Sequence, residues 1–334
     1  MINNQVILVT GGTGSFGKKF IDILLNSFPK VKKIIIYSRD EFKQFEMQER
    51  LKNQKNFNKL RFFLGDIRDK SRLLMALAGV DIIVHAAALK QVPAAEYNPM
   101  EFIKTNVLGT QNIIECALES KVKKVIALST DKACSPINLY GATKLCADKI
   151  VLSANNIKGK KKISFSVVRY GNVINSRGSV VPKLLKEESS GKFSITDLKM
   201  TRFSITLQEG VEAVIWSLFN CKGGEILIPK IPSYNLLTLT RAINKKNKIR
   251  IIGIRPGEKI HEEMILPSDS YLTLDIGKYY IIANNLITKK NIKKRLQGKN
   301  VKLDFHYKSD TNNIFLNEVK LKKIILNEIS PRDI

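Results

Sequence analysis

Cysteines are few in this sequence and stand apart from one another. The 334 residues include four of them, with neither paired nor metal-ligand spacing: Cys116, Cys134, Cys146 and Cys221. We therefore expect reduced thiols, no disulfide framework and no bound metal.

Long apolar runs and a signal-peptide pattern are also missing. The apolar runs of the predicted core, at 6–9, 34–36 and 82–84, are far shorter than the roughly 20 residues of a membrane-spanning helix. The N-terminus leads straight into a strand pattern, without the charged and apolar regions of a secretory signal. These absences predict a cytoplasmic protein with no membrane partner.

Acidic residues are scarce relative to basic ones. The chain has 56 Lys and Arg against 30 Asp and Glu, a formal net charge of +26. Such an excess is compatible with nucleic-acid binding. However, the lysines are scattered, and clusters such as 160–162 and 289–294 have no interleaved aromatic residues on which bases would stack. We expect no nucleic-acid partner; the same positive field would favour small anionic ligands.

The apolar pattern predicts strands that alternate with helices. Short buried strands are expected at 5–10, 33–38, 60–64, 80–88, 124–130 and 163–170, with helices between them, for example over 106–120 and 140–154. This alternation is typical of an α/β protein with a doubly wound parallel sheet of the Rossmann type.

The character of the chain changes after about residue 173. Segments become shorter, and Pro182, Pro229, Pro232 and Pro256 punctuate them more densely. We predict a dinucleotide-binding domain over 1–173 and a smaller substrate-binding lobe over 174–288, part of which returns to the sheet. The lysine-rich segment 289–334 is expected to be a peripheral tail.

A glycine-rich turn directly follows the first predicted strand. Gly11, Gly14 and Gly17 have the spacing that allows a tight turn, close approach of the backbone to a pyrophosphate and close helix–strand packing. The N-terminus of the following helix would supply amide donors to the phosphates. The predicted dinucleotide contacts here are Gly11, Thr13, Gly14, Ser15, Phe16 and Gly17.

The tip of the second strand bears on the choice between NADP and NAD. An NAD enzyme usually has a carboxylate there for the ribose hydroxyls, whereas this chain has Ser38 and Arg39, followed by Lys43. A hydroxyl, a guanidinium and an ammonium suit a 2′-phosphate, so we predict NADP. Asp40 leaves two alternatives open, because it either faces the ribose or caps the next helix.

Residues after the third and fourth strands complete the predicted cofactor site. Asp66 and Ile67 are placed to touch the adenine. Ala86, Ala87 and Ala88 are small and leave room for the nicotinamide ribose and the pyrophosphate.

Two short motifs carry the predicted chemistry. Tyr140 and Lys144 stand one helical turn apart, so the ammonium is expected to lower the pKa of the phenol and make it a base for alcohol oxidation beside a nicotinamide. Asp131 and Lys132, just upstream, add an acid and a base that simple oxidation does not need. The additional acid and base predict that the substrate is oxidised only transiently, in order to allow the elimination of a group from it.

Longer blocks of sequence resemble a known family. Together with the glycine turn and Tyr-x-x-x-Lys, the blocks at 37–41, 85–93, 105–110, 129–133, 169–173 and 176–180 resemble the extended short-chain dehydrogenase/reductase family. Within it they are similar to the UDP-N-acetylglucosamine 4,6-dehydratases that invert C5 and begin pseudaminic acid synthesis. The resemblance covers roughly residues 5–265.

The resemblance implies a mechanism. NADP would take a hydride from C4 while Tyr140, assisted by Lys144, takes the hydroxyl proton and Thr130 hydrogen-bonds the C4 oxygen. Lys132, as a neutral amine with a lowered pKa, would then remove the C5 proton, and Asp131 would protonate the departing 6-hydroxyl. Return of the hydride to C6 and reprotonation of C5 from the opposite face would complete the reaction. Related enzymes that do not invert C5 have glutamate at the position of Lys132, so this lysine would determine that C5 is inverted.

The resemblance also implies substrate contacts and an assembly. Residues expected to contact UDP-N-acetylglucosamine are Lys90, Asn172, Arg177, Thr201, Arg202, Arg255 and Glu258. Asn175 departs from the small residue expected before Arg177. The helices over 106–120 and 140–154 would form the faces of a homo-oligomer. Alternatives are a UDP-sugar 4-epimerase or a related dehydratase and, more distantly, a nucleic-acid-binding Rossmann protein that senses NADP.

Overall fold

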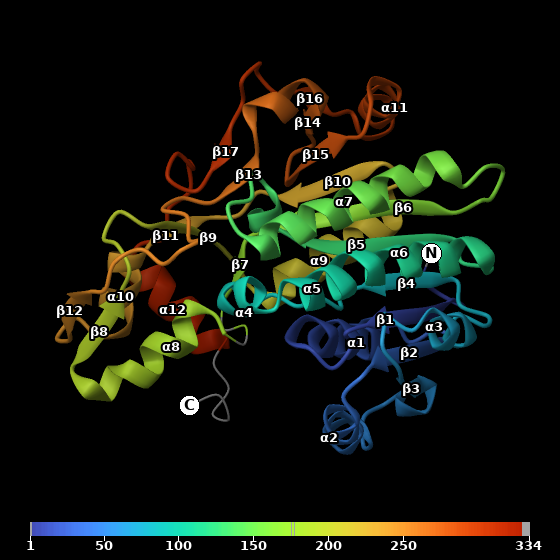
Figure 1. Cartoon of the computed structure of the whole chain (residues 1–334), viewed down its shortest axis with the longest axis horizontal. Helices are drawn as coiled ribbons and strands as arrows, with labels where there is room; N and C mark the ends of the chain where they lie inside the picture. Colours follow the sequence, from blue (N-terminus) through green and yellow to red (C-terminus); the bar gives the residue numbers. More distant parts are fainter. Residues whose placement is uncertain (1, 175, 177, 329–334) are drawn as a thin grey trace.

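The computed structural model describes residues 2–174, 176 and 178–328, and its centre is a ten-stranded mixed sheet (Figure 1). The strand order is β16-β14-β15-β10-β6-β5-β4-β1-β2-β3. The parallel part comprises β1 (Val6–Thr10), β2 (Lys33–Ser38), β3 (Leu60–Leu64), β4 (Ile82–His85), β5 (Lys124–Thr130), β6 (Ser164–Tyr170) and β10 (Glu225–Pro229). This arrangement confirms the predicted α/β class with a doubly wound parallel sheet.

Helices cover the sheet because its central strands are apolar on both faces. Every residue of β1 is buried, which is typical of a parallel strand between two helical layers. In Figure 1, α6 and α7 cross in front of the sheet and α9 lies behind it. The helices of this part are α1 (Ser15–Ser27), α2 (Glu41–Leu51), α3 (Lys70–Ala76), α4 (Val92–Tyr97), α5 (Pro99–Phe102), α6 (Gly109–Glu119), α7 (Leu139–Ile157) and α9 (Leu207–Asn220).

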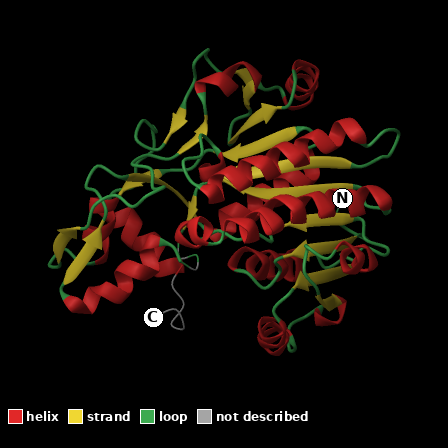
Figure 2. Cartoon of the chain, in the orientation of Figure 1, coloured by secondary structure: helices red, strands yellow, loops and turns green. Residues whose placement is uncertain are grey.

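A smaller lobe with its own core lies beside the carboxyl ends of the parallel strands (Figure 2). It contains the three-stranded sheet β7 (Asn172–Val173), β9 (Thr201–Ile205) and β11 (Ser233–Asn235), the parallel pair β8 (Lys192–Ile195) and β12 (Lys248–Ile251), and the helices α8 (Val180–Glu187) and α10 (Leu236–Ile243). Buried Phe193, Tyr234 and Leu239 are part of its core.

The last part of the chain contacts both the sheet and the lobe. β14 (Thr273–Asp275), β15 (Tyr279–Ala283) and β16 (Lys299–Asn300) extend the main sheet in antiparallel fashion, and α11 (Leu286–Leu296) packs on β15. β17 (Tyr307–Lys308) pairs with β13 (Glu263–Ile265), and α12 (Glu318–Glu328) packs on α10. The domain boundaries at 173 and 288 stay a prediction.

The helices in the described ranges include none that combines the length and the apolar character needed to cross a membrane.

Candidate active site

A cavity of about 810 Å³ lies between the carboxyl ends of β1, β4 and β5 and the smaller lobe. Most of the predicted site residues line it: Gly11, Gly14, Ser15, Phe16, Gly17, Ala86, Ala88, Lys90, Thr130, Lys132, Tyr140, Lys144, Asn172, Arg202, Arg255 and Glu258. Other predicted residues are not part of its lining: Thr13, Ser38, Arg39, Lys43, Asp66, Ile67, Ala87, Asp131 and Thr201. Arg177 and Asn175 lie outside the described residues.

The glycine turn has a shape that larger residues would destroy. Gly11 adopts a φ of +65°, and a Cβ there would lie 2.9 Å from the backbone of Ala87. A Cβ on Gly17 would lie 2.5 Å from the backbone of Gly12. No side chain caps the N-terminus of α1 at Gly14, and its first turn carries no acidic residue. The amides of Gly11 and Gly14 donate within the fold, so the donors available to a phosphate are the first amides of α1, whose residues line the cavity. The turn therefore fits a dinucleotide.

The tip of β2 resolves the two alternatives for Asp40. Its Oδ1 accepts a hydrogen bond from the Lys43 amide at 3.0 Å and so caps α2, while the Lys43 ammonium pairs with Oδ2 of the same carboxylate. Ser38 is buried, with its hydroxyl 2.8 Å from that of Thr13. Arg39 is exposed and lies 3.8 Å from Asp66. This pair is exposed and therefore holds Arg39 only weakly.

Tyr140 and Lys144 project from the first turns of α7 into the cavity. The Asn138 side chain caps this helix by accepting from the Gly141 amide at 2.8 Å. The Lys144 ammonium donates to the Leu128 carbonyl of β5 at 2.7 Å. Burial raises the pKa of Tyr140 to about 12, although the nearby Lys132 ammonium acts in the opposite direction. Burial also lowers the pKa of Lys144. The expected lowering of the Tyr140 pKa is therefore wrong for this structure, because desolvation of the phenol outweighs the opposing effects of Lys132 and of the hydrogen bond with Thr130.

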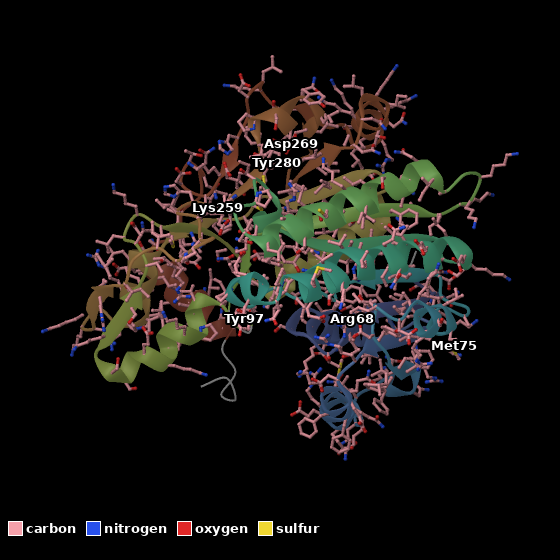
Figure 3. All side chains as sticks on the ribbon, in the orientation of Figure 1. Arg68, Met75, Tyr97, Lys259, Asp269 and Tyr280 are labelled. Atoms are coloured by element: carbon pink, nitrogen blue, oxygen red, sulfur yellow. The ribbon has the colours of Figure 1, made fainter. Side chains whose placement is uncertain are left out.

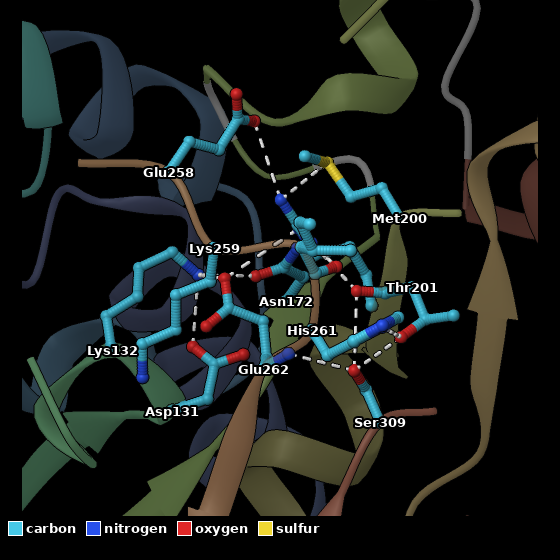
Figure 4. A network of polar contacts seen from close by, with 12 residues as sticks. Asp131, Lys132, Asn172, Met200, Thr201, Glu258, Lys259, His261, Glu262 and Ser309 are labelled. Carbon is cyan, nitrogen blue, oxygen red and sulfur yellow. Dashed lines mark hydrogen bonds and ion pairs between the residues drawn. The ribbon is translucent and has the colours of Figure 1, made fainter. Parts of the chain in front are cut away.

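Lys132 lies at the centre of a buried polar network (Figure 4). Its ammonium is 3.1 Å from Asp131 Oδ1, 3.0 Å from Asn172 Oδ1 and 3.2 Å from Glu262 Oε1. Burial alone would lower the pKa of Lys132, but the two carboxylates outweigh it and raise that pKa. The prediction of a lowered lysine pKa is therefore wrong for this arrangement, in which the side chains of Asp131 and Glu262 both contact the ammonium and stabilise it.

Asp131 lies behind the wall of the cavity. Its side chain is fully buried, Oδ1 accepts a hydrogen bond from the Thr130 hydroxyl at 2.9 Å, and no described residue is a hydrogen-bond partner of Oδ2. Burial raises the pKa of this carboxyl and so favours its protonated form. Asp131 contacts Thr130 and Lys132, and both of these residues line the cavity.

Glu262 is a site residue that our sequence reasoning missed. Its carboxylate lines the cavity, its side chain is 3% exposed, and it contacts the ammonium of Lys132 and, at 3.7 Å, the guanidinium of Arg202. No sequence pattern singles it out, because Glu262 precedes β13 and the register of that strand is irregular between Glu263 and Ile265. A buried carboxylate needs a charged partner, and only the fold brings Lys132 and Arg202 to it.

The lobe presents further polar groups to the cavity. Arg202 donates to the carbonyls of Thr201 and Ile260 and lies 3.5 Å from Glu258. The Thr201 hydroxyl is 2.8 Å from His261 and 2.7 Å from Ser309, so Thr201 supports the lobe rather than lining the cavity.

Lys259, labelled in Figure 3, links the segment before β13 to the segment that follows β5. Its ammonium donates a hydrogen bond to the Cys134 carbonyl at 2.7 Å.

A glycine turn at the first strand of a doubly wound sheet, with a buried Tyr-x-x-x-Lys pair beside the fifth, is the arrangement of Rossmann-fold dehydrogenases and reductases of the extended short-chain class. The chain belongs to the polysaccharide biosynthesis protein family, whose sequence model matches residues 7–284.

Comparison with known proteins shows which members of this family the chain is similar to. The chain is 51% identical over 336 residues to a protein of Campylobacter jejuni subsp. jejuni named UDP-N-acetylglucosamine 4,6-dehydratase (inverting), with 97% of this chain and 98% of the relative covered. It is 38% identical to a UDP-glucose 4-epimerase of Rickettsia canadensis, with 98% of both covered. The X-ray structure of Pen from Bacillus thuringiensis has a TM-score of 0.90 at 36% identity and covers 98% of both chains. The predicted resemblance to the inverting dehydratases is confirmed.

Proposed function

We propose that this protein is a UDP-N-acetylglucosamine 4,6-dehydratase that inverts C5. The observation that carries the proposal is the position of Lys132, which lines the same cavity as Tyr140 and Lys144 and is joined to Asp131. An oxidising pair next to a separate acid–base pair suits an elimination that depends on a transient ketone. The 51% identical relative with this activity in its name supports the same conclusion.

The first half of the proposed reaction is oxidation at C4. Hydride transfer from C4, and later back to C6, is the chemistry that a bound nicotinamide dinucleotide supplies. Tyr140 takes the hydroxyl proton, Lys144 stabilises the phenolate, and Thr130 hydrogen-bonds the C4 oxygen. The residues that would hold the dinucleotide are those of the glycine turn and the alanines after β4, Ala86 to Ala88.

The second half is elimination across C5 and C6. Lys132, as a free amine, removes the C5 proton that the neighbouring ketone has acidified. The proton for the departing 6-hydroxyl comes from Asp131 and passes through Thr130 or Lys132, because Asp131 itself does not line the cavity. After hydride return to C6, a proton from solvent reaches C5 on the opposite face, and Tyr140 releases to solvent the proton that it took from the C4 hydroxyl. The product is the inverted 4-keto sugar.

The surroundings of the cavity suit a nucleotide sugar. Arg255 and Lys90 line it as cations for a diphosphate, and Asn172, Arg202 and Glu258 line it as partners for sugar and nucleoside groups. We also place Arg177 and Thr201 among the substrate residues, Thr201 as a support. We assign the reaction to the first step of pseudaminic acid synthesis in the cytoplasm, by a homo-oligomer that associates through α6 and α7.

Turnover of UDP-N-acetylglucosamine in heavy water tests this function. We expect a product that has lost the 6-hydroxyl and carries deuterium at C5, with the configuration at C5 inverted, as seen by NMR. A product that keeps its 6-oxygen and differs only at C4 would instead identify a 4-epimerase, the function named for the Rickettsia relative.

Substitution Arg39→Asp tests the preference for NADP, which we propose from Ser38, Arg39 and Lys43. Loss of one charge-assisted contact to the 2′-phosphate should raise the Kd for NADP about tenfold or more, with a smaller change for NAD. Isothermal titration with both dinucleotides measures this difference. Arg50→Asp is the control, because Arg50 lies at the far end of α2 and pairs with Asp22 of α1. Equal weakening of both dinucleotides by Arg39→Asp would exclude the contact.

A further inference from the structure

The carboxylate of Glu262 is held against the ammonium of Lys132. Its Oε1 is 3.2 Å from Nζ, and its Oε2 is buried and has no hydrogen-bond partner among the residues that the structure describes. A buried carboxylate oxygen without a hydrogen-bond donor destabilises the fold, so its presence in a native structure points to a functional role. Glu262 also lines the cavity, so a ligand that fills the cavity would remove the remaining water from this pair.

The backbone on either side fixes this position. The Glu262 amide donates to the Ser309 hydroxyl at 2.9 Å, and the Ser309 amide donates to the Glu262 carbonyl at 2.8 Å. The next residue, Glu263, begins the strand β13 that pairs with β17. The carboxylate therefore extends from a rigid segment toward Lys132.

The proposed elimination needs an unprotonated Lys132, whereas the structure stabilises the ammonium. Its surplus proton must move to a neighbouring base. Asp131 is the acid of the proposed elimination and must keep its own proton for the departing hydroxyl, so it is not the acceptor; burial, which raises its pKa, acts in the same direction. Burial would raise the pKa of Glu262 as well, but Lys132 and Arg202 outweigh it and lower that pKa, so Glu262 is the ionised partner.

We propose that Glu262 accepts the ammonium proton of Lys132 when the cavity fills, and so produces the free amine that removes the C5 proton. One N–H bond breaks at Nζ and one O–H bond forms at Glu262, which converts a buried ion pair into a neutral pair. Exclusion of water favours this change, because burial penalises charged groups more than neutral ones.

The protons balance over one elimination. Lys132 gains the C5 proton, Asp131 gives its proton to the departing hydroxyl, and water leaves. Asp131 then regains a proton from Lys132, which regains one from Glu262, and the starting state is restored. Glu262 acts through Lys132, so it is a positioning and proton-accepting residue. The inference deepens the dehydratase function and rests on it.

Other charged or titratable groups also face Lys132 and Glu262 and affect the proton equilibrium between these two side chains. They come from several elements: Lys90, Asp131, Tyr140, Arg202, Tyr234 and Lys259. Because Lys90, Arg202 and Lys259 are cations, removal of the Glu262 charge leaves Lys132 in a more positive environment. Its proton would then be lost to solvent instead of to a neighbouring group.

The pH profile of Glu262→Gln tests the proposal. In the wild type, internal transfer keeps kcat for dehydration nearly constant between about pH 6 and 9, where free carboxylates and guanidinium groups do not titrate. In the variant, Lys132 must lose its proton to solvent, so kcat at neutral pH should fall about tenfold or more and rise about tenfold per pH unit. C4 oxidation depends on Tyr140, so formation of reduced nicotinamide should persist.

Two further variants complete the experiment. Glu262→Asp keeps a carboxylate and should recover much of kcat with the wild-type pH profile; it carries the test alone if Glu262→Gln does not fold. Glu263→Gln is the matched control, because Glu263 pairs with Lys259 and His306 instead of Lys132. A Glu262→Gln profile that keeps the wild-type shape, or a Glu262→Asp profile with the new slope, would overturn the inference. Failure of the wild type to release water would overturn the dehydratase function itself, so the two failures are distinct.

Discussion

Substitution of Lys132 by arginine is expected to abolish dehydration while C4 oxidation continues. Arginine keeps a cation next to Asp131 and Glu262, so the buried carboxylates retain a partner. It stays protonated, however, and cannot accept the C5 proton. We expect kcat for dehydration to fall about 10²–10⁴-fold, with reduced nicotinamide accumulating up to the equilibrium of C4 oxidation, because no C6 acceptor forms and the hydride can return only to C4.

Parallel measurement of product by NMR and of nicotinamide absorbance checks this result. Lys132→Met removes the cation as well and should give the same block with lower thermal stability, because buried Glu262 loses its counter-ion and buried Asp131 loses a hydrogen-bond donor. Lys123→Met is the control, because Lys123 is 63% exposed and pairs with Asp81 away from the cavity. Full dehydration by Lys132→Arg would show that the C5 base is another residue.

Substitution of Tyr140 by phenylalanine is expected to stop the reaction one step earlier. The C4 hydroxyl then has no base, so neither product nor reduced nicotinamide should form, and the rate of oxidation should fall about 10²–10⁴-fold. Tyr140 is buried against the cavity and phenylalanine keeps its ring, so we expect folding and dinucleotide affinity to be preserved.

The absence of reduced nicotinamide separates this variant from Lys132→Arg. Stopped-flow absorbance with UDP-N-acetylglucosamine measures the difference directly. Tyr271→Phe, at an exposed tyrosine, controls for loss of a phenol as such. Accumulation of reduced nicotinamide in Tyr140→Phe would assign the oxidation base to another group.

Much of the main domain could be predicted because its signals are local. Buried strands such as β1 appear as continuous apolar runs, and the glycines of the turn follow β1 directly. Helix N-caps are equally local, yet the sequence does not decide between the two roles of Asp40. A carboxylate that caps a helix and one that faces a ribose have the same neighbours in sequence, and only the structure shows the cap.

The directions of the pKa shifts could not be predicted. They depend on the balance between burial and partners that are distant in sequence. Lys132 was expected to be a weak base held neutral, but Glu262, far along the chain, is brought to 3.2 Å from it. Tyr140 is likewise governed by desolvation, which no spacing of residues along α7 reveals. The sequence thus indicates which groups are present, whereas the fold determines their protonation.

The order of strands in the main sheet has a consequence for synthesis of the chain. β6 pairs with β5, which precedes it, and with β10, which begins at Glu225. A ribosome that has released only the first half of the protein therefore exposes β6 as an open edge, and such edges template aggregation. Nascent chains should need a chaperone, or rapid translation through the lobe, until β10 closes that edge.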